Sequence, residues 1–198
     1  MTKVIMGASM SLDGYIAGPN ESGFDHLFAW HNNGEVEIPA AHEQWTFRPG
    51  RASEPVVREY LQVGAIVCGR RLFDLTQGWG GHHPLGAPVF VVTHNVPTDW
   101  PHPDAPFTFV TDGVESAVRQ AQKAAGDSYV SIAAGNVGRQ ALEAGLVDEV
   151  RVELVPVFLG GGTRFADDIA GAPVALGNPR VIEGDRVTHL QYPVIPQS

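Results

Sequence analysis

The sequence predicts an α/β fold with a mainly parallel central sheet, flanking helices and an antiparallel hairpin at the C-terminal edge. Three observations support this prediction. Short apolar runs alternate with stretches of helical period along most of the 198 residues, which is the pattern of β-α-β units. Two strand-like runs end at a glycine that opens a helix, Gly69 and Gly135. Near the C-terminus, strand-like residues 174–182 and 186–195 flank the hairpin signal Glu183-Gly184-Asp185.

The chain is predicted to begin with a strand, a turn and a long irregular segment. Residues 4–9 form the strand, Asp13-Gly14 the turn, and residues 15–17 a short extended piece. Residues 18–52 are polar and irregular, and a segment of this length in a compact domain is usually functional or mobile. Two tryptophans are expected to anchor it: Trp30 and Trp45.

A helix, three strands and a second helix are predicted to follow. Ser53 is expected to cap the first helix, with Glu54 and Pro55 in its first turn. Its apolar face consists of Val56, Val57, Tyr60 and Leu61. The strands are expected at residues 65–68, 88–92 and 107–110. The second helix, residues 113–125, places Val114, Ala117, Val118 and Ala121 on one face.

Residues 128–162 hold the most informative pattern of the chain. An apolar strand at residues 129–133 runs into the small-residue turn Ala134-Gly135, and a helix begins at Asn136. A second strand, residues 149–158, stops at three consecutive glycines. The first N–H groups of a helix lack intrahelical acceptors, so this junction suits a phosphate. A simple connection between strand and helix is an equally good reading, and neither a Rossmann fingerprint nor a Walker lysine motif is present.

Composition limits the classes of function. The 13 Lys and Arg residues against 22 Asp and Glu give a formal net charge of −9, and without a basic block neither nucleic acid nor an anionic membrane is an expected partner. The N-terminus lacks a signal-peptide pattern, and no apolar run approaches a membrane span. We therefore expect one cytoplasmic domain over residues 1–198, in which the single cysteine, Cys68, is a buried thiol.

Five segments, in order along the chain, resemble a known superfamily. They are Ser11–Gly18, Gly69-Arg70-Arg71, Thr93-His94-Asn95, Gly135–Gly138 and Val155–Gly162. Together they resemble the dihydrofolate-reductase-like superfamily. The resemblance is closer to the branch that contains the C-terminal reductase domain of bacterial riboflavin biosynthesis, here as a stand-alone domain without the deaminase part. It spans roughly residues 3–193.

The resemblance implies a reductase that uses NADPH to transfer hydride to a small heterocyclic or carbonyl substrate. Arg70 and Arg71 offer guanidinium forks to the 2′-phosphate of the cofactor. The adenosine portion is expected at Thr93 and His94, and the pyrophosphate on the N–H groups that follow Gly135. The implied cofactor-binding residues are Met10, Ile16, Gly69, Arg70, Arg71, Thr93, His94, Gly135, Asn136, Val137 and Gly138.

The expected substrate side is less sharply defined. Asp13 is the one candidate for a catalytic residue, and it is equally well explained as the shaping residue of a turn. The candidate substrate-binding residues are Asp13, Trp79, Phe158, Gly160 and Gly161. No metal is expected, because His82-His83 and His102 show no ligand spacing.

Two departures from the relatives bear on the substrate. The riboflavin enzymes tend to place a glutamate just before the glycine turn, where this chain has Ile132-Ala133-Ala134. Dihydrofolate reductase uses an acidic residue on its early helix, and the acidic residues of that region match no such motif: Asp25, Glu35, Glu37 and Glu43. Alternative functions are a non-catalytic nucleotide-binding module and a flavin-using reductase. The relatives also imply a homodimer, formed through residues 149–158 or the C-terminal hairpin.

Overall fold

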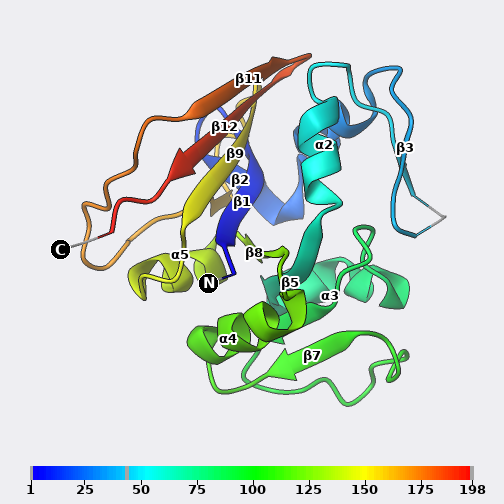
Figure 1. The fold of residues 1–198 in the computed structure, drawn as a ribbon, viewed down its shortest axis with the longest axis vertical. Coiled ribbons are helices and arrows are strands. Elements are labelled where there is room, and N and C mark those ends of the chain that lie inside the picture. Colours follow the sequence, from blue (N-terminus) through cyan, green and yellow to red (C-terminus); the bar gives the residue numbers. More distant parts are fainter. Residues whose placement is uncertain (1, 43–44, 197–198) are drawn as a thin grey trace.

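The computed structural model describes residues 2–42 and 45–196, and its centre is an eight-stranded sheet in the order β11-β12-β9-β1-β8-β5-β6-β7 (Figure 1). The strands are β1 (Val4–Ser11), β5 (Val63–Gly69), β6 (Val89–Val92), β7 (Phe107–Val110), β8 (Tyr129–Ala133), β9 (Glu149–Val155), β11 (Arg180–Gly184) and β12 (Val187–Pro193). All pairs from β9 to β7 are parallel, whereas β12 is antiparallel to both β9 and β11. The predicted α/β class and antiparallel edge are thus confirmed.

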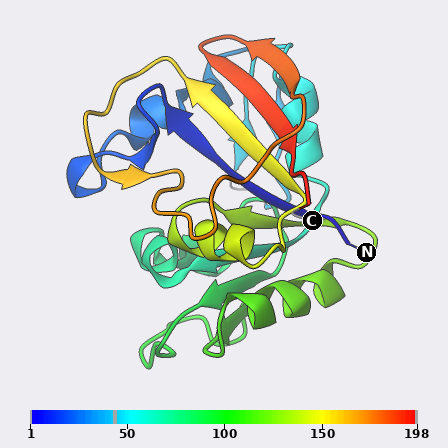
Figure 2. The same ribbon diagram turned by 90° about the vertical axis from the view of Figure 1, so that its left-hand side faces the viewer.

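Helices cover both faces of this sheet (Figures 1 and 2). Ala65 and Val67 of β5 pack in one apolar cluster with α4 (Val114–Ala125) and α5 (Asn136–Glu143). The alternate residues Ile66 and Cys68 pack on the other face with Phe73 of α3 (Arg70–Leu75). Because successive strand residues point to opposite faces, β5 is buried on both sides, as a parallel strand between helices must be.

The segment between β1 and β5 adds a third apolar cluster. After β2 (Tyr15–Ala17) come η1 (Pro19–Glu21), α1 (Phe24–Leu27), η2 (Ala29–Asn32), β3 (Ile38–Pro39), β4 (Thr46–Phe47) and α2 (Glu54–Tyr60). Leu27, Trp30 and Ile38 are almost fully buried against Val56 and Val57 of α2. Trp30 is therefore the anchor that the sequence predicts. Trp45 was predicted wrongly as a second anchor, because it stays 49% exposed on the β3–β4 hairpin.

Two predicted strands were too long at their proline-containing ends. The strand predicted for residues 149–158 ends at Val155, because Pro156 has no N–H to continue the ladder. The strand predicted for residues 174–182 begins only at Arg180, directly after Pro179. Before it, Leu176 makes an isolated bridge to Val194.

Cys68 is fully buried, and this burial raises the pKa of its thiol to about 12. The expected buried thiol is thus confirmed. It is unreactive, because the raised pKa keeps the thiol protonated and only the thiolate is nucleophilic.

Within residues 2–42 and 45–196, no helix is long and apolar enough to cross a membrane.

Candidate active site

The carboxyl ends of the parallel strands bring four of the predicted cofactor residues to one edge of the sheet. A Cβ added to Gly69, after β5, would lie 3.0 Å from Cγ2 of Val137 in α5. A Cβ added to Gly135, after β8, would lie 3.3 Å from Cδ1 of Ile16 in β2. Ile16, Gly69, Gly135 and Val137 are therefore neighbours. This is the crevice in which open α/β sheets bind ligands.

The start of α5 leaves backbone donors free at this edge. Gly135 has φ +86° and ψ −148°, a conformation that favours glycine. Its N–H donates to the carbonyl of Phe165 (2.8 Å), and the N–H of Arg139 donates to the carbonyl of Gly135 (2.8 Å). Between them, the amides of Asn136, Val137 and Gly138 have no backbone acceptor in the described part of the chain. This first turn can therefore receive an anionic group.

Gly138 has a structural reason to be glycine. A Cβ there would lie 2.7 Å from the carbonyl oxygen of Ala133 and 3.0 Å from Cε of Met6. The missing side chain lets α5 pack closely on β1 and β8. Met10, the other predicted cofactor residue of β1, is half-buried against the same apolar cluster.

The two predicted phosphate-binding arginines are held by partners of the chain itself. Arg70 donates to Oδ1 of Asp74 (2.7 Å) and to the carbonyl of Asn95 (2.8 Å), so it connects α3 to the turn after β6. Arg71 is ion-paired with Glu21 of η1, and its side chain is 70% exposed. A phosphate at this place must share or replace the contacts to Asp74 and Glu21.

In the turn after β6, Thr93 has a structural role and His94 is accessible to solvent. Thr93 is buried, and its hydroxyl donates to the carbonyl of Asn95 (2.9 Å). Thr93 therefore shapes the turn. His94 is exposed and available to a ligand.

Asp13 holds a loop. Its carboxylate accepts hydrogen bonds from the hydroxyl of Ser11 (2.6 Å) and from the N–H groups of Leu159 (3.1 Å) and Gly160 (2.7 Å). These donors, the Ser11 hydroxyl first, lower the pKa of Asp13 to about 2. Asp13 is then ionised at neutral pH, so the catalytic role considered for it cannot be that of a proton donor.

The glycine-rich turn held by Asp13 has its close backbone approach at Gly162. A Cβ on Gly162 would lie 2.1 Å from the carbonyl oxygen of Ala17, whereas one on Gly160 would meet nothing within 4 Å. Gly161 is open except for a ring carbon of Pro19 at 3.6 Å. Phe158, a predicted substrate residue, is 71% exposed. Gly162 was not among the site residues predicted from the sequence.

Arg164 is a second residue of this region that was not predicted from the sequence. It follows the glycine turn in β10 (Thr163–Arg164), which pairs with β2. Its guanidinium lies 4.8 Å from the centroid of the Tyr15 ring and has no carboxylate partner among the described residues. The next residue, Phe165, accepts the hydrogen bond from Gly135. The backbone of this segment thus borders the start of α5, while the guanidinium of Arg164 lies over Tyr15, near Gly14.

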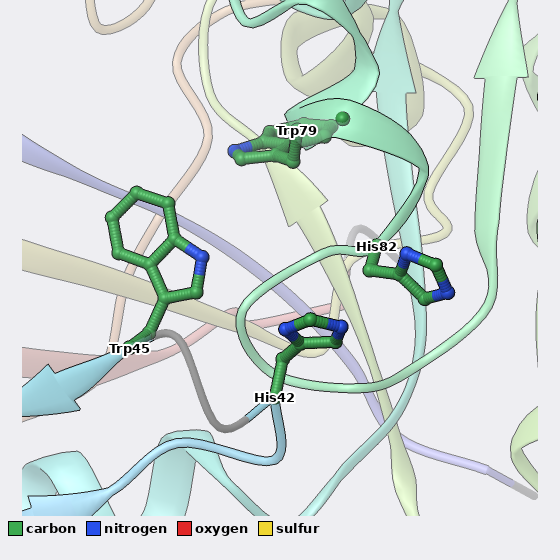
Figure 3. A pocket seen from close by; sticks show the side chains of 5 residues that line it. His42, Trp45, Trp79 and His82 are labelled. Atoms are coloured by element: carbon green, nitrogen blue, oxygen red, sulfur yellow. The ribbon is translucent and has the colours of Figure 1, made fainter. Parts of the chain in front are cut away.

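Trp79 lines a pocket that shares no lining residue with this crevice. Its element η3 (Gln77–Gly81) follows α3 directly and faces the β3–β4 hairpin (Figure 3). The pocket has a volume of about 210 Å³ and is lined by His42, Trp45, Trp79, Gly80 and His82. Within the described residues, no three His, Cys, Asp or Glu side chains are placed to hold a metal ion.

Sequence comparison identifies the family of this chain. Residues 2–186 match the family described as the RibD C-terminal domain. The chain belongs to this family. No protein of curated function matches it.

Solved structures resemble the whole fold at low sequence identity. A putative riboflavin biosynthesis protein from Shewanella sp. PV-4 shares 22% identity with a TM-score of 0.71, over 98% of this chain and all of that one. RibD from Acinetobacter baumannii shares 15% with a TM-score of 0.62, and 98% of this chain matches 58% of that one. Enterococcus faecalis dihydrofolate reductase, complexed with NADP(H), shares 15% with a TM-score of 0.57, over 97% and 96% of the chains. The fold is therefore dihydrofolate-reductase-like.

The RibD-like fold of this chain also contains a buried polar network. His189 of β12 is fully buried and bonded to the carboxylate of Glu153, while its Nε2 lies 2.8 Å from the hydroxyl of Ser53. Tyr60 donates to the other oxygen of Glu153, and burial, followed by this carboxylate, raises the pKa of Tyr60 well above its usual value. The predicted cap at Ser53 is wrong in its detail, since the side chain bonds His189 and makes no cap hydrogen bond. The network joins α2, β9 and β12.

Proposed function

We propose that this protein is an NADPH-dependent oxidoreductase that transfers hydride to a small heterocyclic or carbonyl substrate. The observation that carries the proposal is the free first turn of α5, which begins between Gly69 and Ile16 at the carboxyl edge of the sheet. Membership of the RibD C-terminal domain family supports it, because the reductases of this family commonly use NADPH.

Different residues at this edge would bind different parts of the cofactor. In the proposal the amides of Asn136 and Val137 receive the pyrophosphate, and the Arg164 side chain turns from Tyr15 towards the bound anion and adds a positive charge. Arg70 and Arg71 face the 2′-phosphate. The nicotinamide supplies hydride when bound, and the chain positions it and excludes water. In the proposal Asp13 keeps the loop at residues 158–160 in place through its hydrogen bonds to Leu159 and Gly160 and does not act as the proton donor.

A titration with NADPH and with NADH, followed by tryptophan fluorescence, tests the cofactor assignment. We expect NADPH to bind much more tightly. Replacement of both Arg70 and Arg71 by alanine should weaken NADPH binding at least tenfold and change NADH binding little, because only NADPH carries the 2′-phosphate. Arg58→Ala is the matched control, since Arg58 makes the same type of ion pair within a helix, with Glu54, on α2. Equal loss for both cofactors would reject the assignment.

A non-catalytic nucleotide-binding module is the second candidate. It is favoured by the ionised state of Asp13 and by the apolar run Ile132-Ala133-Ala134 before α5, where the riboflavin enzymes tend to place a glutamate. Tight NADPH binding without oxidation in the presence of any carbonyl or heterocyclic compound of a broad panel would support this candidate. A yellow purified protein would instead indicate a flavin.

We also propose that the protein forms a homodimer. β11 is an edge strand of the sheet, and Val181 on it is 51% exposed. An unpaired edge with an exposed apolar side chain can pair with a second copy. Light scattering after size exclusion should give twice the monomer mass, and a monomer at all working concentrations would reject this proposal.

A further inference from the structure

An ion pair joins two elements that border the proposed cofactor crevice. Arg71 lies in the first turn of α3, and its partner Glu21 lies in η1, 50 residues earlier in the chain. The contacts of Gly69 and Gly135 place the start of α5 between the beginning of α3 and β2, the strand that leads into η1. The pair therefore connects the two elements that flank the free first turn of α5.

Glu21 occupies one edge of the Arg71 guanidinium. Nε and Nη2 of Arg71 both contact the same carboxylate oxygen, Oε1 of Glu21. Two adjacent N–H groups of this kind form the fork with which an arginine binds a phosphate. A phosphate that uses this edge must displace Glu21, so the carboxylate and the phosphate compete for the same donors.

The backbone that carries Glu21 has an uncommon conformation. Asn20 and Glu21 have φ values of +54° and +59°, in the left-handed region that non-glycine residues seldom occupy. The loop is closed at its base, where the N–H of Gly18 donates to the carbonyl of Ser22 (2.8 Å). Conformations of this kind persist only where the surroundings enforce them. Glu21 is thus presented by a constrained loop, and the side chain of Arg71, which is 70% exposed, is the partner that can move.

Arg71 differs from its neighbour Arg70 in how it is held. Arg70 is bonded to Asp74 within α3 and to the carbonyl of Asn95. In the described part of the chain, the polar contacts of the Arg71 guanidinium are all to Glu21. A cation in the first turn of a helix also gains nothing from the helix dipole. Arg71 can therefore turn from Glu21 to an anion without breaking a contact within α3.

We infer that Glu21 is a specificity-determining residue that competes with the 2′-phosphate of NADPH for the Nε and Nη2 donors of Arg71. When NADPH binds, Arg71 exchanges the carboxylate for the phosphate. NADH has no 2′-phosphate, so it binds without this exchange. Glu21 therefore lowers the affinity for NADPH relative to that for NADH. The inference rests on the proposed function, in which Arg71 faces this phosphate.

Titration of Glu21→Gln with NADPH and with NADH, followed by tryptophan fluorescence, tests this inference. Glutamine keeps the size of the side chain and removes its charge. NADPH affinity should rise about threefold to fivefold, the size of effect expected when a surface ion pair no longer has to be broken. NADH affinity should not change. A rise that is equal for both cofactors would indicate a change in the shape of the loop and would overturn the inference.

Asp25→Asn is the matched control for Glu21→Gln. Asp25 lies in the adjacent helix α1, its side chain is 79% exposed, and its recorded ion pair is with His26. This variant removes the same charge from the same segment, so both cofactors should bind it like the native protein. A gain in NADPH affinity equal to that of Glu21→Gln would reflect net charge and would also overturn the inference.

Glu21→Gln in an Arg71→Ala background shows whether Glu21 acts through Arg71. We expect the gain in NADPH affinity to disappear there, because no guanidinium remains to be released. An undiminished gain would mean that Glu21 repels the phosphate directly, and would overturn its action through Arg71.

The same titrations distinguish this inference from the proposed function. Preferential NADPH binding by the native protein, with unchanged affinity in Glu21→Gln, would reject the competition alone. Binding of neither cofactor by either protein would reject the cofactor assignment, and the competition with it.

Discussion

The two polar clusters of this molecule differ in the residues that form them, in burial and in the pairing of their polar groups. Ser53, Glu153 and His189 are almost fully buried, and their polar side chains bond to one another and to Tyr60. At the carboxyl edge of the sheet, Arg71 is largely exposed, Arg164 lacks a carboxylate partner among the described residues, and the first amides of α5 are free. A closed network stabilises the fold, whereas an open one retains binding capacity. Substitutions should therefore affect stability in the first cluster and ligand affinity in the second.

The largest effect is expected for Glu153→Ala. This substitution leaves both the Tyr60 hydroxyl and the His189 ring without their buried partner. The free energy of unfolding should fall by about 3 kcal/mol, since each orphaned buried group costs about 1–3 kcal/mol. Urea denaturation measures the change. Glu115→Ala, at an exposed pair with Arg119, is the control and should change stability by less than about 0.5 kcal/mol.

Gly135→Ala should affect both stability and binding. At φ +86° an alanine is strained, and its Cβ would lie 3.3 Å from Ile16. We expect a loss of about 1–2 kcal/mol in unfolding free energy and a clear loss of NADPH affinity. Gly126→Ala is the control, because Gly126 also has positive φ (+59°) and meets nothing within 4 Å. If both variants lost stability and neither lost NADPH affinity, the start of α5 would not be the pyrophosphate site.

The stability of Asp13→Asn as a function of pH tests the comparison further. Asp13 lies near the carboxyl edge of the sheet, but its hydrogen bonds hold a loop, so its replacement should affect stability. Folding lowers its pKa from 3.8 to about 2. A depressed carboxyl pKa stabilises the folded state above pH 3.8, and this stabilisation disappears as the pH falls from 3.8 towards 2. Asp13→Asn should therefore be less stable than the native protein at pH 7, and the difference should shrink below pH 4. Urea denaturation at pH 7, 4 and 3 measures it, and a difference that stays constant would contradict the assignment.

Features formed by residues close in sequence could be predicted, whereas features formed by contacts between residues far apart in sequence could not. The strand–glycine–helix junctions at Gly69 and Gly135 are local patterns, so the sequence predicted both them and the sheet edge where they meet. The buried network joins Ser53 to His189 across 136 residues, and no local pattern announces such a contact. For the same reason Ser53 was read as a helix cap, the role that its local sequence favours.

The pocket at Trp79 shows an intermediate case. Trp79 between two glycines was a visible signal, but its partners come from the β3–β4 hairpin, which the sequence presented only as an irregular segment. Trp45 was predicted, like Trp30, to anchor this segment. Only the pairing of Ala40 with Trp45 reveals that the hairpin holds this indole at the surface. Arg164 was missed because an isolated arginine after a glycine run has no distinctive spacing.

The smallest effect is expected for Arg164→Gln. The side chain lies over Tyr15 at the surface, and an exposed cation–π contact contributes only about 0.5–1 kcal/mol, so the unfolding free energy should change little. NADPH affinity should fall about threefold to tenfold, because one positive charge beside the pyrophosphate is lost. The loss should be the same for NADH, which separates Arg164 from Arg70 and Arg71 at the 2′-phosphate. Arg186→Gln is the control: this arginine also lacks a carboxylate partner in the described part of the chain, but it lies in the β11–β12 turn. If both variants reduced NADPH affinity equally, the effect would reflect net charge, and Arg164 would lose its place in the site.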